Sequence, residues 1–577
     1  MSVTLSIDGK KVAVPEGTTV LEAAKQAGIF IPTLCHYEGL PPQSECRLCI
    51  VEVKGGRGLP ASCTLPAKEG MEIATCSERV LEARKFLLQL LLCAHPADCK
   101  TCEKHGRCEL QKMLSDYGVR NYENPMRARK QLVDKSSKAI ERDLVKCVLC
   151  GRCVRMCRDV QTVGVYSFAC RGLDSAVTTA FDKPIAETPC VSCGQCTIVC
   201  PTGALSEKES IDDVWTALQS GKHVVCQVAP SVRVSIGEMF GLPPGTIVTG
   251  QLVAALHRLG FAKVFDTDFG ADLTIMEEGK ELLEKLKEGK PLLSTSCCPA
   301  WINFVERFYP ELIPQLSTTK SPQQMFGAIA KTYYAQKAGV KPEDMAVISI
   351  MPCTAKKMEA ARPEMNASGA GRDVDFVLTT REAARMMMQA GIHLPSMQPE
   401  GFDEPLGEAS GAGVIFGTTG GVTEAALRTA SEVYAGKKLD KIEFKQVRGF
   451  DTLREATVEI NGRKVKVAAV HTLGAARRIL DEMKEGKAPY DFVEVMACRG
   501  GCVGGGGQPI PSREKRIEAI KARQRAIYAV DASLPVRKSH ENPAIKKLYK
   551  EFLGEPGSEK SKKLLHTKLS PSKGYGV

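Results

Sequence analysis

Twenty-four cysteines are clustered along the 577-residue chain, with spacings that are typical of metal ligands. The strongest pattern is a duplicated C-x2-C-x2-C-x3-C run, first CVLCGRCVRMC and then CVSCGQCTIVC. Three thiolates of such a run can bind three corners of a cuboidal 4Fe–4S cluster, while the fourth cysteine ligates the other cluster. Structural zinc usually takes two separated pairs instead. The runs therefore predict two clusters, one held by Cys147, Cys150, Cys153 and Cys200 and its neighbour by Cys157, Cys190, Cys193 and Cys196.

Two upstream groups leave the identity of the metal open. One group combines a close pair with two distant cysteines, Cys35, Cys46, Cys49 and Cys63. It suits a 2Fe–2S cluster, although its x10 gap departs from the plant-type spacing, and zinc is the alternative. The other group is His95, Cys99, Cys102 and Cys108. Zinc and a 4Fe–4S cluster with one histidine ligand are equally good on these residues alone, and His95 could also belong to a helix cap. The neighbouring cysteine groups favour a cluster.

Beyond about residue 210, short apolar runs alternate with helical stretches, as in a doubly wound α/β domain. Four of these runs end at a cysteine or a proline-bearing turn. The turns are Ala229-Pro230-Ser231, Cys297-Cys298-Pro299, Met351-Pro352-Cys353 and Met496-Ala497-Cys498. Ligands of open parallel sheets bind beyond the carboxyl ends of the strands. We therefore expect one deep site that is lined by these four strand ends.

The cysteines of this second half can build one more metal centre. Four of them suffice for a cuboidal cluster: Cys298, Cys353, Cys498 and Cys502. Cys297 is then a thiol at the site without a ligand role, which makes it a candidate proton carrier. The four isolated cysteines are expected to be small buried hydrophobic residues: Cys76, Cys93, Cys170 and Cys226.

Three segments have the order and spacing that resemble the iron-only (FeFe) hydrogenases. They are TSCCPAW (295–301), MPCTAKKMEA (351–360) and EVMACRGGCVGGGGQP (494–509). The upstream groups resemble the accessory domains of the large monomeric clostridial type. The resemblance implies an H-cluster, in which Cys298, Cys353, Cys498 and Cys502 hold a 4Fe–4S cube. Cys502 would bridge this cube to a two-iron unit that carries CO, cyanide and an azadithiolate.

The resemblance also implies roles for residues around the two-iron unit. Lys356 would hydrogen-bond a cyanide, and the unit would be surrounded by Pro230, Ser231, Gln323, Met351 and Met496. Protons would pass along Cys297, Glu278, Ser317 and Glu281. Taken alone, the two glutamates suit a solvated helix face as well as a proton path. Lys356, taken alone, is typical of an ordinary surface lysine. Arg499 stands where the resemblance leads us to expect proline, and its charge would raise the potential of the cube.

The modules together predict an α+β multidomain protein. Residues 1–79 are expected to form a β-grasp 2Fe–2S module, with a hairpin over 3–14 and a helix that Thr19 and Glu22 begin as a capping box. A His/Cys3 4Fe–4S module (80–125) and a bacterial-ferredoxin-like two-cluster module (126–209) follow. Residues 210–577 are expected to form a two-lobed α/β catalytic domain with the H-cluster between the lobes, ending in a small-subunit-like segment over about 512–577.

Composition and charge indicate the cellular location that we expect and the partners that the protein can bind. Hydrophobic residues make up 43% and charged residues 25%, as in ordinary globular proteins. We expect no membrane span, no signal peptide and a cytoplasmic location, where dense cysteines indicate metal binding rather than disulfides. The net charge of +11 suits an acidic ferredoxin or flavodoxin as electron partner, and no motif indicates nucleic acid. A monomer is expected, with H2 and protons as substrates and maturation proteins that insert the two-iron unit.

The leading hypothesis is a ferredoxin-coupled hydrogenase, and three alternatives were weighed against it. A sensor with the same cluster is disfavoured because Cys297 is retained and no signalling domain follows. An electron-transfer subunit of a respiratory-type complex would explain the first 209 residues but not the H-cluster motifs. A subunit of an NAD(H)-linked multimeric hydrogenase stays open, and it would need partner chains because this sequence has no visible flavin or nicotinamide site.

Overall fold

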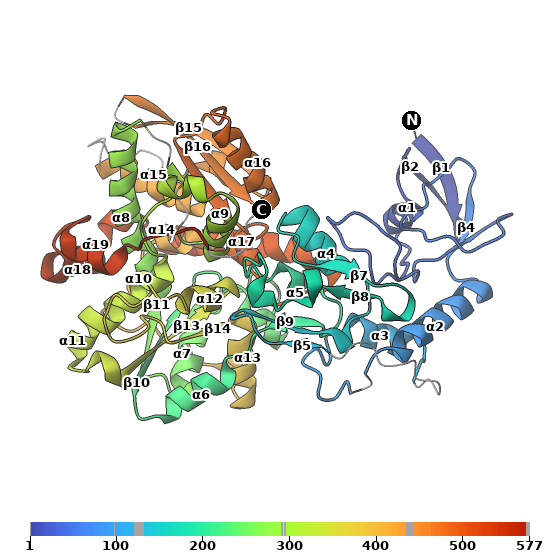
Figure 1. Ribbon diagram of the computed structural model, residues 1–577, viewed down its shortest axis with the longest axis horizontal. Coiled ribbons are helices and arrows are strands. Elements are labelled where there is room, and N and C mark those ends of the chain that lie inside the picture. Colours follow the sequence, from blue (N-terminus) through green and yellow to red (C-terminus); the bar gives the residue numbers. More distant parts are fainter. Residues whose placement is uncertain are drawn as a thin grey trace. The chain divides into compact units, whose positions relative to one another are not determined.

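The computed structural model describes residues 2–96, 98–120, 132–289, 292–293, 296–433, 442–460 and 462–572. The chain divides into two compact units, shown as a ribbon in Figure 1. The N-terminal unit comprises Met1–Thr188 and Cys196–Ser206, and the C-terminal unit comprises Pro189–Gln195 and Glu207–Val577. The predicted boundary between residues 125 and 126 lies outside the described residues.

The N-terminal unit begins with a four-stranded sheet of order β2-β1-β4-β3. Its strands are β1 (Ser2–Ile7), β2 (Lys10–Pro15), β3 (Glu52–Val53) and β4 (Glu72–Ala74). Strands β1 and β2 form the predicted antiparallel hairpin, while β1 and β4 run parallel. Helix α1 (Val20–Gln26) begins with the predicted capping box, in which Thr19 accepts a bond from the Glu22 N–H. Its apolar side packs against the sheet in one buried cluster.

Buried arginines connect the remaining parts of this unit. These parts include α2 (Glu78–Cys93), α3 (Glu109–Asp116), α4 (Arg152–Arg155), β5 (Val133–Asp134), β6 (Ile140–Asp143), β7 (Ser167–Ala169) and β8 (Ala176–Thr178). From α2, Arg84 donates to the carbonyls of Leu48 and Ile50 in the loop before β3. From α4, Arg152 makes a bidentate pair with Glu109 of α3, at 2.6 and 2.8 Å. Such a planar pair fixes both position and orientation.

The C-terminal unit contains two four-stranded sheets, orders β11-β10-β13-β14 and β12-β17-β16-β15. The first is entirely parallel: β10 (His223–Val228), β11 (Lys263–Asp266), β13 (Met345–Met351) and β14 (Phe376–Thr379). In the second, β12 (Leu292–Leu293), β17 (Phe492–Met496) and β16 (Arg463–His471) are parallel, and β15 (Leu453–Ile460) is antiparallel. Every residue of β13 is buried, as expected for a parallel strand that is covered on both faces.

Helices cover both sheets of this unit (Figure 1). They are α6 (Ile211–Gln219), α7 (Thr249–Leu259), α8 (Thr267–Lys287), α9 (Pro299–Phe308), α10 (Pro322–Ile329), α11 (Ala335–Ala338), α12 (Ala355–Ala360), α13 (Thr380–Gln389), α14 (Gly411–Val414), α15 (Gly421–Val433), α16 (Leu473–Lys484), α17 (Arg516–Ser533), α18 (Pro543–Leu548) and α19 (Glu559–Leu565). Two elements, α5 (Gln195–Val199) and β9 (Leu205–Glu207), cross a boundary between the units. No helix among the described residues is long and apolar enough to span a bilayer.

The expectation that all four isolated cysteines are buried is wrong for two of them. Cys226 is buried in β10, and Cys93 is partly exposed at the end of α2. Cys76 and Cys170 are exposed. Cys76 lies in the short connection between β4 and α2, and Cys170 follows β7 with a left-handed backbone at φ 61°. Both stand in turns, which the spacing of cysteines alone does not reveal.

Candidate metal centres and active site

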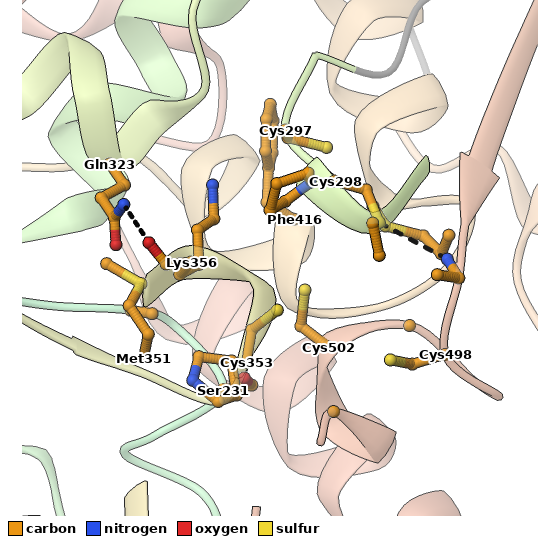
Figure 2. A pocket seen from close by; sticks show the side chains of 18 of the residues that line it. Ser231, Cys297, Cys298, Gln323, Met351, Cys353, Lys356, Phe416, Cys498 and Cys502 are labelled. Atoms are coloured by element: carbon orange, nitrogen blue, oxygen red, sulfur yellow. Dashed lines mark hydrogen bonds between the residues drawn. The ribbon is translucent and has the colours of Figure 1, made fainter. Parts of the chain in front are cut away.

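The carboxyl ends of strands from both sheets of the C-terminal unit meet at one cavity, seen from close by in Figure 2. Ala229, Pro230 and Ser231 follow β10, Met351 ends β13, and Met496 ends β17. The cavity and its mouth contain about 740 Å³ of space that no protein atom fills. Its wall includes Cys297, Cys298, Cys353, Cys498, Cys502, Gln323 and Lys356. The strands thus bring residues far apart in the sequence to one place.

The four cysteines predicted as cube ligands all face this space. Burial and, to a smaller extent, the neighbouring Cys298 thiol raise the pKa of the Cys353 thiol to about 11. Burial also raises the pKa of Cys298, Cys498 and Cys502. Backbone and side-chain donors reach two of the sulfurs: the Ala497 N–H lies 3.5 Å from Cys298 Sγ, and Gln195 Nε2 lies 3.2 Å from Cys498 Sγ. Four thiols that line one cavity in this way are the donor set of an iron–sulfur cluster.

Glycines allow the backbone around the cysteines to pack closely at the wall of the cavity. Gly501 adopts φ +91°, and a Cβ there would collide with Thr418 and Thr419. A Cβ on Gly505 would collide with the carbonyl oxygen of Pro352, so the glycine run packs directly against the turn after β13. Gln323 carries a buried side-chain oxygen with no hydrogen-bond partner among the described residues. The residues present therefore fit a cubane cluster and an adjoining group with polar ligands.

Lys356 is buried, so the alternative of an ordinary surface lysine is wrong. Its side chain begins on α12 and pairs with Glu359, Nζ to Oε2 at 2.9 Å. Burial by itself would lower the pKa of Lys356, but the Glu359 carboxylate outweighs burial and raises it. Gln323 Nε2 and Ser321 Oγ donate to the same carboxylate oxygen at 3.1 and 2.9 Å. These contacts hold a permanent positive charge at the wall of the cavity.

A row of hydroxyl and carboxyl groups leads away from the cavity along α8. Glu278 Oε1 accepts from Ser296 Oγ at 3.1 Å and from Thr319 Oγ1 at 3.2 Å. Thr319 lies 2.7 Å from Ser317 Oγ, which donates to Glu281 Oε2 at 2.8 Å. Burial raises the pKa of Glu278 to about 8, and the charge of Glu281 acts in the same direction. Glu278 is only 2% exposed, so the alternative of a solvated helix face is wrong for it.

Several residues of the site do not follow from the sequence, among them Ser296, Thr319 and Phe416. Ser296 and Thr319 complete the hydrogen-bonded row, and Phe416 lines the cavity. Ser296 is next to the predicted cysteine pair, so its position was a usable signal. Thr319 is two residues from Ser317, and only the hydrogen bonds distinguish it from other hydroxyl residues. Nothing in the sequence around Phe416 indicates that it faces the cavity.

The predicted 2Fe–2S ligands lie together in the N-terminal unit. Cys35, Cys46, Cys49 and Cys63 are all buried. The N–H groups of Leu34 and Cys35 lie 3.4 and 3.3 Å from Cys46 Sγ. A hydrogen bond from the Cys35 thiol lowers the pKa of Cys46 to about 7, and one from Cys63 does the same for Cys49. Closely placed thiols with inward N–H donors are the surroundings in which thiolate ligands are stabilised.

The cysteines of the duplicated runs occupy both units. A second cavity, in the N-terminal unit, is lined by Cys147, Cys150 and Cys153 of the first run and by Cys200 of the second. In the other predicted set, Cys157 and Cys196 belong to the N-terminal unit, and Cys190 and Cys193 belong to the C-terminal unit. In the His95 group, Cys99 and Cys102 lie in a turn, and the Cys108 thiol caps α3 by accepting from the Gln111 N–H. These ligand sets remain predictions.

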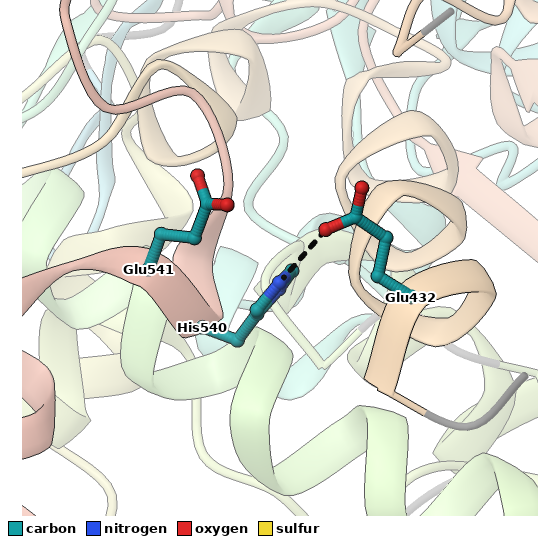
Figure 3. Close-up of side chains that lie close together, drawn as sticks. All are labelled: Glu432, His540 and Glu541. Atoms are coloured by element: carbon teal, nitrogen blue, oxygen red, sulfur yellow. Dashed lines mark hydrogen bonds and ion pairs between the residues drawn. The ribbon is translucent and has the colours of Figure 1, made fainter. Parts of the chain in front are cut away.

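A separate group of ionisable side chains, drawn in Figure 3, is already paired with a lysine of the protein. Glu432, His540 and Glu541 lie close enough together to share a cation. Lys538 Nζ, however, lies 2.7 Å from Glu432 and 3.3 Å from Glu541. His540 Nε2 lies 3.3 Å from Glu432. We interpret this group as ion pairs that attach the C-terminal segment to α15.

Five known domain families match successive parts of the chain. They are described as a 2Fe-2S iron-sulfur cluster binding domain (1–78), an NADH-ubiquinone oxidoreductase-G iron-sulfur binding region (84–122), a 4Fe-4S binding domain (184–206), the iron only hydrogenase large subunit, C-terminal domain (222–506) and the iron hydrogenase small subunit (517–571). They support a multidomain protein with 2Fe–2S, 4Fe–4S and hydrogenase parts.

Individual relatives agree with the family matches. The chain is 48% identical to the NADP-reducing hydrogenase subunit HndD of Solidesulfovibrio fructosivorans, over 98% of each chain. It is 42% identical to iron hydrogenase 1 of Clostridium pasteurianum, over 98% of this chain and 99% of that one. A solved structure of the [FeFe]-hydrogenase HydA1 variant E141A from Chlamydomonas reinhardtii matches 63% of this chain and 99% of its own, at 41% identity and a TM-score of 0.57. With its cavity of converging cysteines, the chain therefore belongs to the iron-only (FeFe) hydrogenase family.

Proposed function

We propose that the chain catalyses 2 H⁺ + 2 e⁻ ⇌ H2 at an H-cluster whose cube is held by Cys298, Cys353, Cys498 and Cys502. The observation that carries this proposal is one cavity with four cysteines, a fifth thiol at Cys297 and a buried cation at Lys356. When bound, the cluster supplies Lewis-acidic iron and one-electron redox chemistry. An azadithiolate in the two-iron unit is part of the proposal.

The chain itself would move the proton. Burial raises the pKa of the Cys297 thiol well above its usual range, so the thiol is protonated at neutral pH. Glu278, with a pKa raised to about 8, is also protonated at neutral pH and can both give and accept a proton. Ser317 and Thr319 connect Glu278 to Glu281 through hydroxyl groups that donate and accept. We assign these residues as the proton path.

Other residues of the cavity would hold and shield the two-iron unit. The Lys356 ammonium is the donor available to cyanide or carbonyl ligands, and the Gln323 amide lies at the same wall. Ser231 and Pro230 follow β10 at the same wall. The side chains of Met351, Met496 and Phe416 are apolar and exclude water from this part of the cavity. These roles are assigned by position and chemistry.

Electrons would travel through the accessory clusters. We propose one 2Fe–2S cluster in a β-grasp module, one 4Fe–4S cluster with the His95 group, and two 4Fe–4S clusters with the duplicated runs. Oxidation of H2 yields two electrons, whereas each cluster accepts one, so the electrons would leave one at a time, and a series of clusters can carry them. Iron and sulfide analysis of the protein without its two-iron unit tests the number of clusters. Cys200→Ser should alter one 4Fe–4S signal and leave the 2Fe–2S signal unchanged.

Two electron partners are proposed, and one experiment separates them. An acidic ferredoxin or flavodoxin suits the net charge of +11. An NADP-linked assembly is the second candidate, because a relative at 48% identity is named an NADP-reducing hydrogenase subunit. The purified chain with H2 should reduce ferredoxin directly under the first proposal. Under the second, ferredoxin is reduced poorly, and NADP⁺ is reduced only when further subunits are added.

The reaction can be tested without any electron partner. A matured chain that activates H2 should exchange D2 with the protons of water and release HD. Absence of exchange in protein whose infrared spectrum shows bound CO and cyanide would favour a sensor that uses the same cluster. Insertion of the two-iron unit by maturation proteins, a cytoplasmic location and a monomeric state remain predictions from the sequence.

A further inference from the structure

A water-accessible cavity lies at the outer end of the proposed proton path. The cavity and its mouth contain about 880 Å³ of space that no protein atom fills, and it is formed by α8, Thr318 and the chain from Gly557 to Lys568. Glu281, the outermost carboxylate of the path, lines it. His566, from the segment that ends α19, lines the opposite side with 13% of its side chain exposed. A polar cavity of this size holds several waters.

Two contacts hold the His566 ring in a defined orientation. Nε2 lies 3.0 Å from Glu277 Oε2, and Nδ1 lies 2.8 Å from Thr318 Oγ1. Glu277 is fully buried and also accepts from the Tyr549 and Ser561 hydroxyls and the Gly557 N–H. Although burial acts to raise the pKa of Glu277, the hydrogen bonds from His566, Ser561 and Tyr549 together outweigh it and lower the pKa. Glu277 is therefore ionised, and it fixes the ring so that Nε2 carries hydrogen and Nδ1 is the nitrogen that exchanges.

Thr318 connects this histidine to the proton path. Its side chain contacts His566, and its backbone N–H donates to both carboxylate oxygens of Glu281 at 3.1 Å. We propose that His566 is the group that exchanges protons between external buffer and Glu281; this rests on the proposed proton path. In H2 evolution the Nδ1–H bond of the imidazolium breaks and its proton passes to the Thr318 hydroxyl, which releases its own proton through cavity water to the Glu281 carboxylate. In H2 oxidation the proton moves in the opposite direction.

The low concentration of free protons gives a physical reason for a proton-exchanging group at the outer end of the path. Free protons near pH 7 are scarce, and even a diffusional rate constant of about 10⁹–10¹⁰ M⁻¹ s⁻¹ delivers only about 10²–10³ of them per second. Buffer molecules are far more abundant, but they need an accessible acceptor. Histidine changes charge within about pH 5–8, so it can accept protons from neutral buffers. The other charged groups that face the cavity are Lys280 and Glu284 on α8, and Lys562 and Lys568.

The test compares His566→Gln with His540→Gln in the loaded enzyme. His540 is a matched control, because it lies on the same C-terminal segment and also contacts a carboxylate, Glu432, but lies outside the cavity (Figure 3). Two backbone bonds, Thr567 N–H to Thr318 and Lys320 N–H to Leu565, hold the segment in either variant. In dilute buffer near pH 8, His566→Gln should turn over on the order of tenfold more slowly, less than the roughly 10²–10⁴-fold of a buried general acid, because water reaches the cavity. Concentrated imidazole should restore the rate to within about twofold of the original.

Other outcomes would refute either the role of His566 or the proton path on which it rests. Equal rates for His566→Gln and the unaltered protein at every pH and buffer concentration refute the role of His566, and so does a loss that is the same in all buffers. Glu281→Gln tests the proton path separately from the role of His566. If that variant is fully active, the proton path itself is wrong. Nitrogen NMR of ¹⁵N-histidine-labelled protein provides a readout without turnover. It should show hydrogen on Nε2 of His566 at high pH, and hydrogen on Nδ1 instead would refute the proposed orientation.

Discussion

Replacing Glu278 by glutamine tests the electrostatics of the proton path. The carboxyl is buried on α8 and accepts hydrogen bonds from Ser296 and Thr319. Glutamine keeps the shape and an accepting oxygen, but it can neither release nor bind a proton. The variant should lose roughly 10²–10⁴-fold in H2 evolution, the range typical of a general acid or base.

The raised pKa of Glu278 also fixes the sign and size of a stability effect. Its folded-state pKa of about 8 lies above the ordinary value of 4.5, so the folded protein holds one proton more than the unfolded chain between these two pH values. Stability from this group is present below about pH 4.5 and falls as the pH rises, by about 1.4 kcal/mol per unit. Across the whole window the loss is about 5 kcal/mol. Glu278→Gln lacks this slope.

Infrared and fluorescence measurements check this prediction. The pH-difference infrared spectrum should contain a carboxylic-acid band that disappears with a midpoint near pH 8 in the unaltered protein and is absent in Glu278→Gln. Urea unfolding of the cluster-free protein can be followed by the two tryptophans, Trp215 and Trp301, which both lie in the C-terminal unit. Between pH 5.5 and 7.5, the unaltered protein should lose about 3 kcal/mol relative to the variant.

A control variant distinguishes this effect from simple loss of a carboxylate. Glu288→Gln removes an exposed carboxylate just beyond the end of α8 and should leave the slope of stability against pH unchanged. A carboxyl midpoint near pH 4.5, or equal slopes for the unaltered protein and Glu278→Gln, would refute the reasoning.

Three further predictions concern the walls of the cluster cavity. Gln195→Leu removes a donor to the Cys498 sulfur, a bond worth about 1 kcal/mol, and should lower the reduction potential of the cube by on the order of 20–40 mV in a redox titration followed by electron paramagnetic resonance. Lys356→Met leaves the buried Glu359 without its only cationic partner among the described residues and should cost about 3–5 kcal/mol in urea unfolding, whereas adding Glu359→Gln should recover most of the stability but not the activity. Gly505→Ala places a methyl group against the turn after β13, and it should cost about 1–3 kcal/mol and reduce the iron content of the protein.

Metal-ligand spacing and strand ends could be read from the sequence because both are local patterns. The apolar runs before Ser231, Cys353 and Cys498 do become strands that end at one cavity. The hydroxyl Thr319 could not be predicted, because its role depends on hydrogen bonds to residues on α8 that only the tertiary fold brings close. His566 was missed for the same reason, since it lies 289 positions from Glu277 in the chain.

The burial of single residues is the second feature of the site that could not be predicted from the sequence. Apart from its motif, nothing in the sequence indicates that Lys356 lies inside the protein, because its burial depends on the pairing with Glu359 one helical turn away. For Cys170 the expectation of burial rests on the general tendency of cysteine to be buried, but the residue is exposed. Where a turn or an ion pair decides whether a residue is buried, its burial can be seen only in the structure.

The most direct test of the account is H2 evolution by anaerobically purified, fully matured protein with an excess of a low-potential reduced dye, compared with Cys297→Ala. The account predicts fast turnover that collapses in the variant, while the infrared bands of bound CO and cyanide persist in both proteins. Negligible turnover by the unaltered protein with these bands present would contradict the catalytic function. Full activity of Cys297→Ala would contradict the proton path that begins at this thiol.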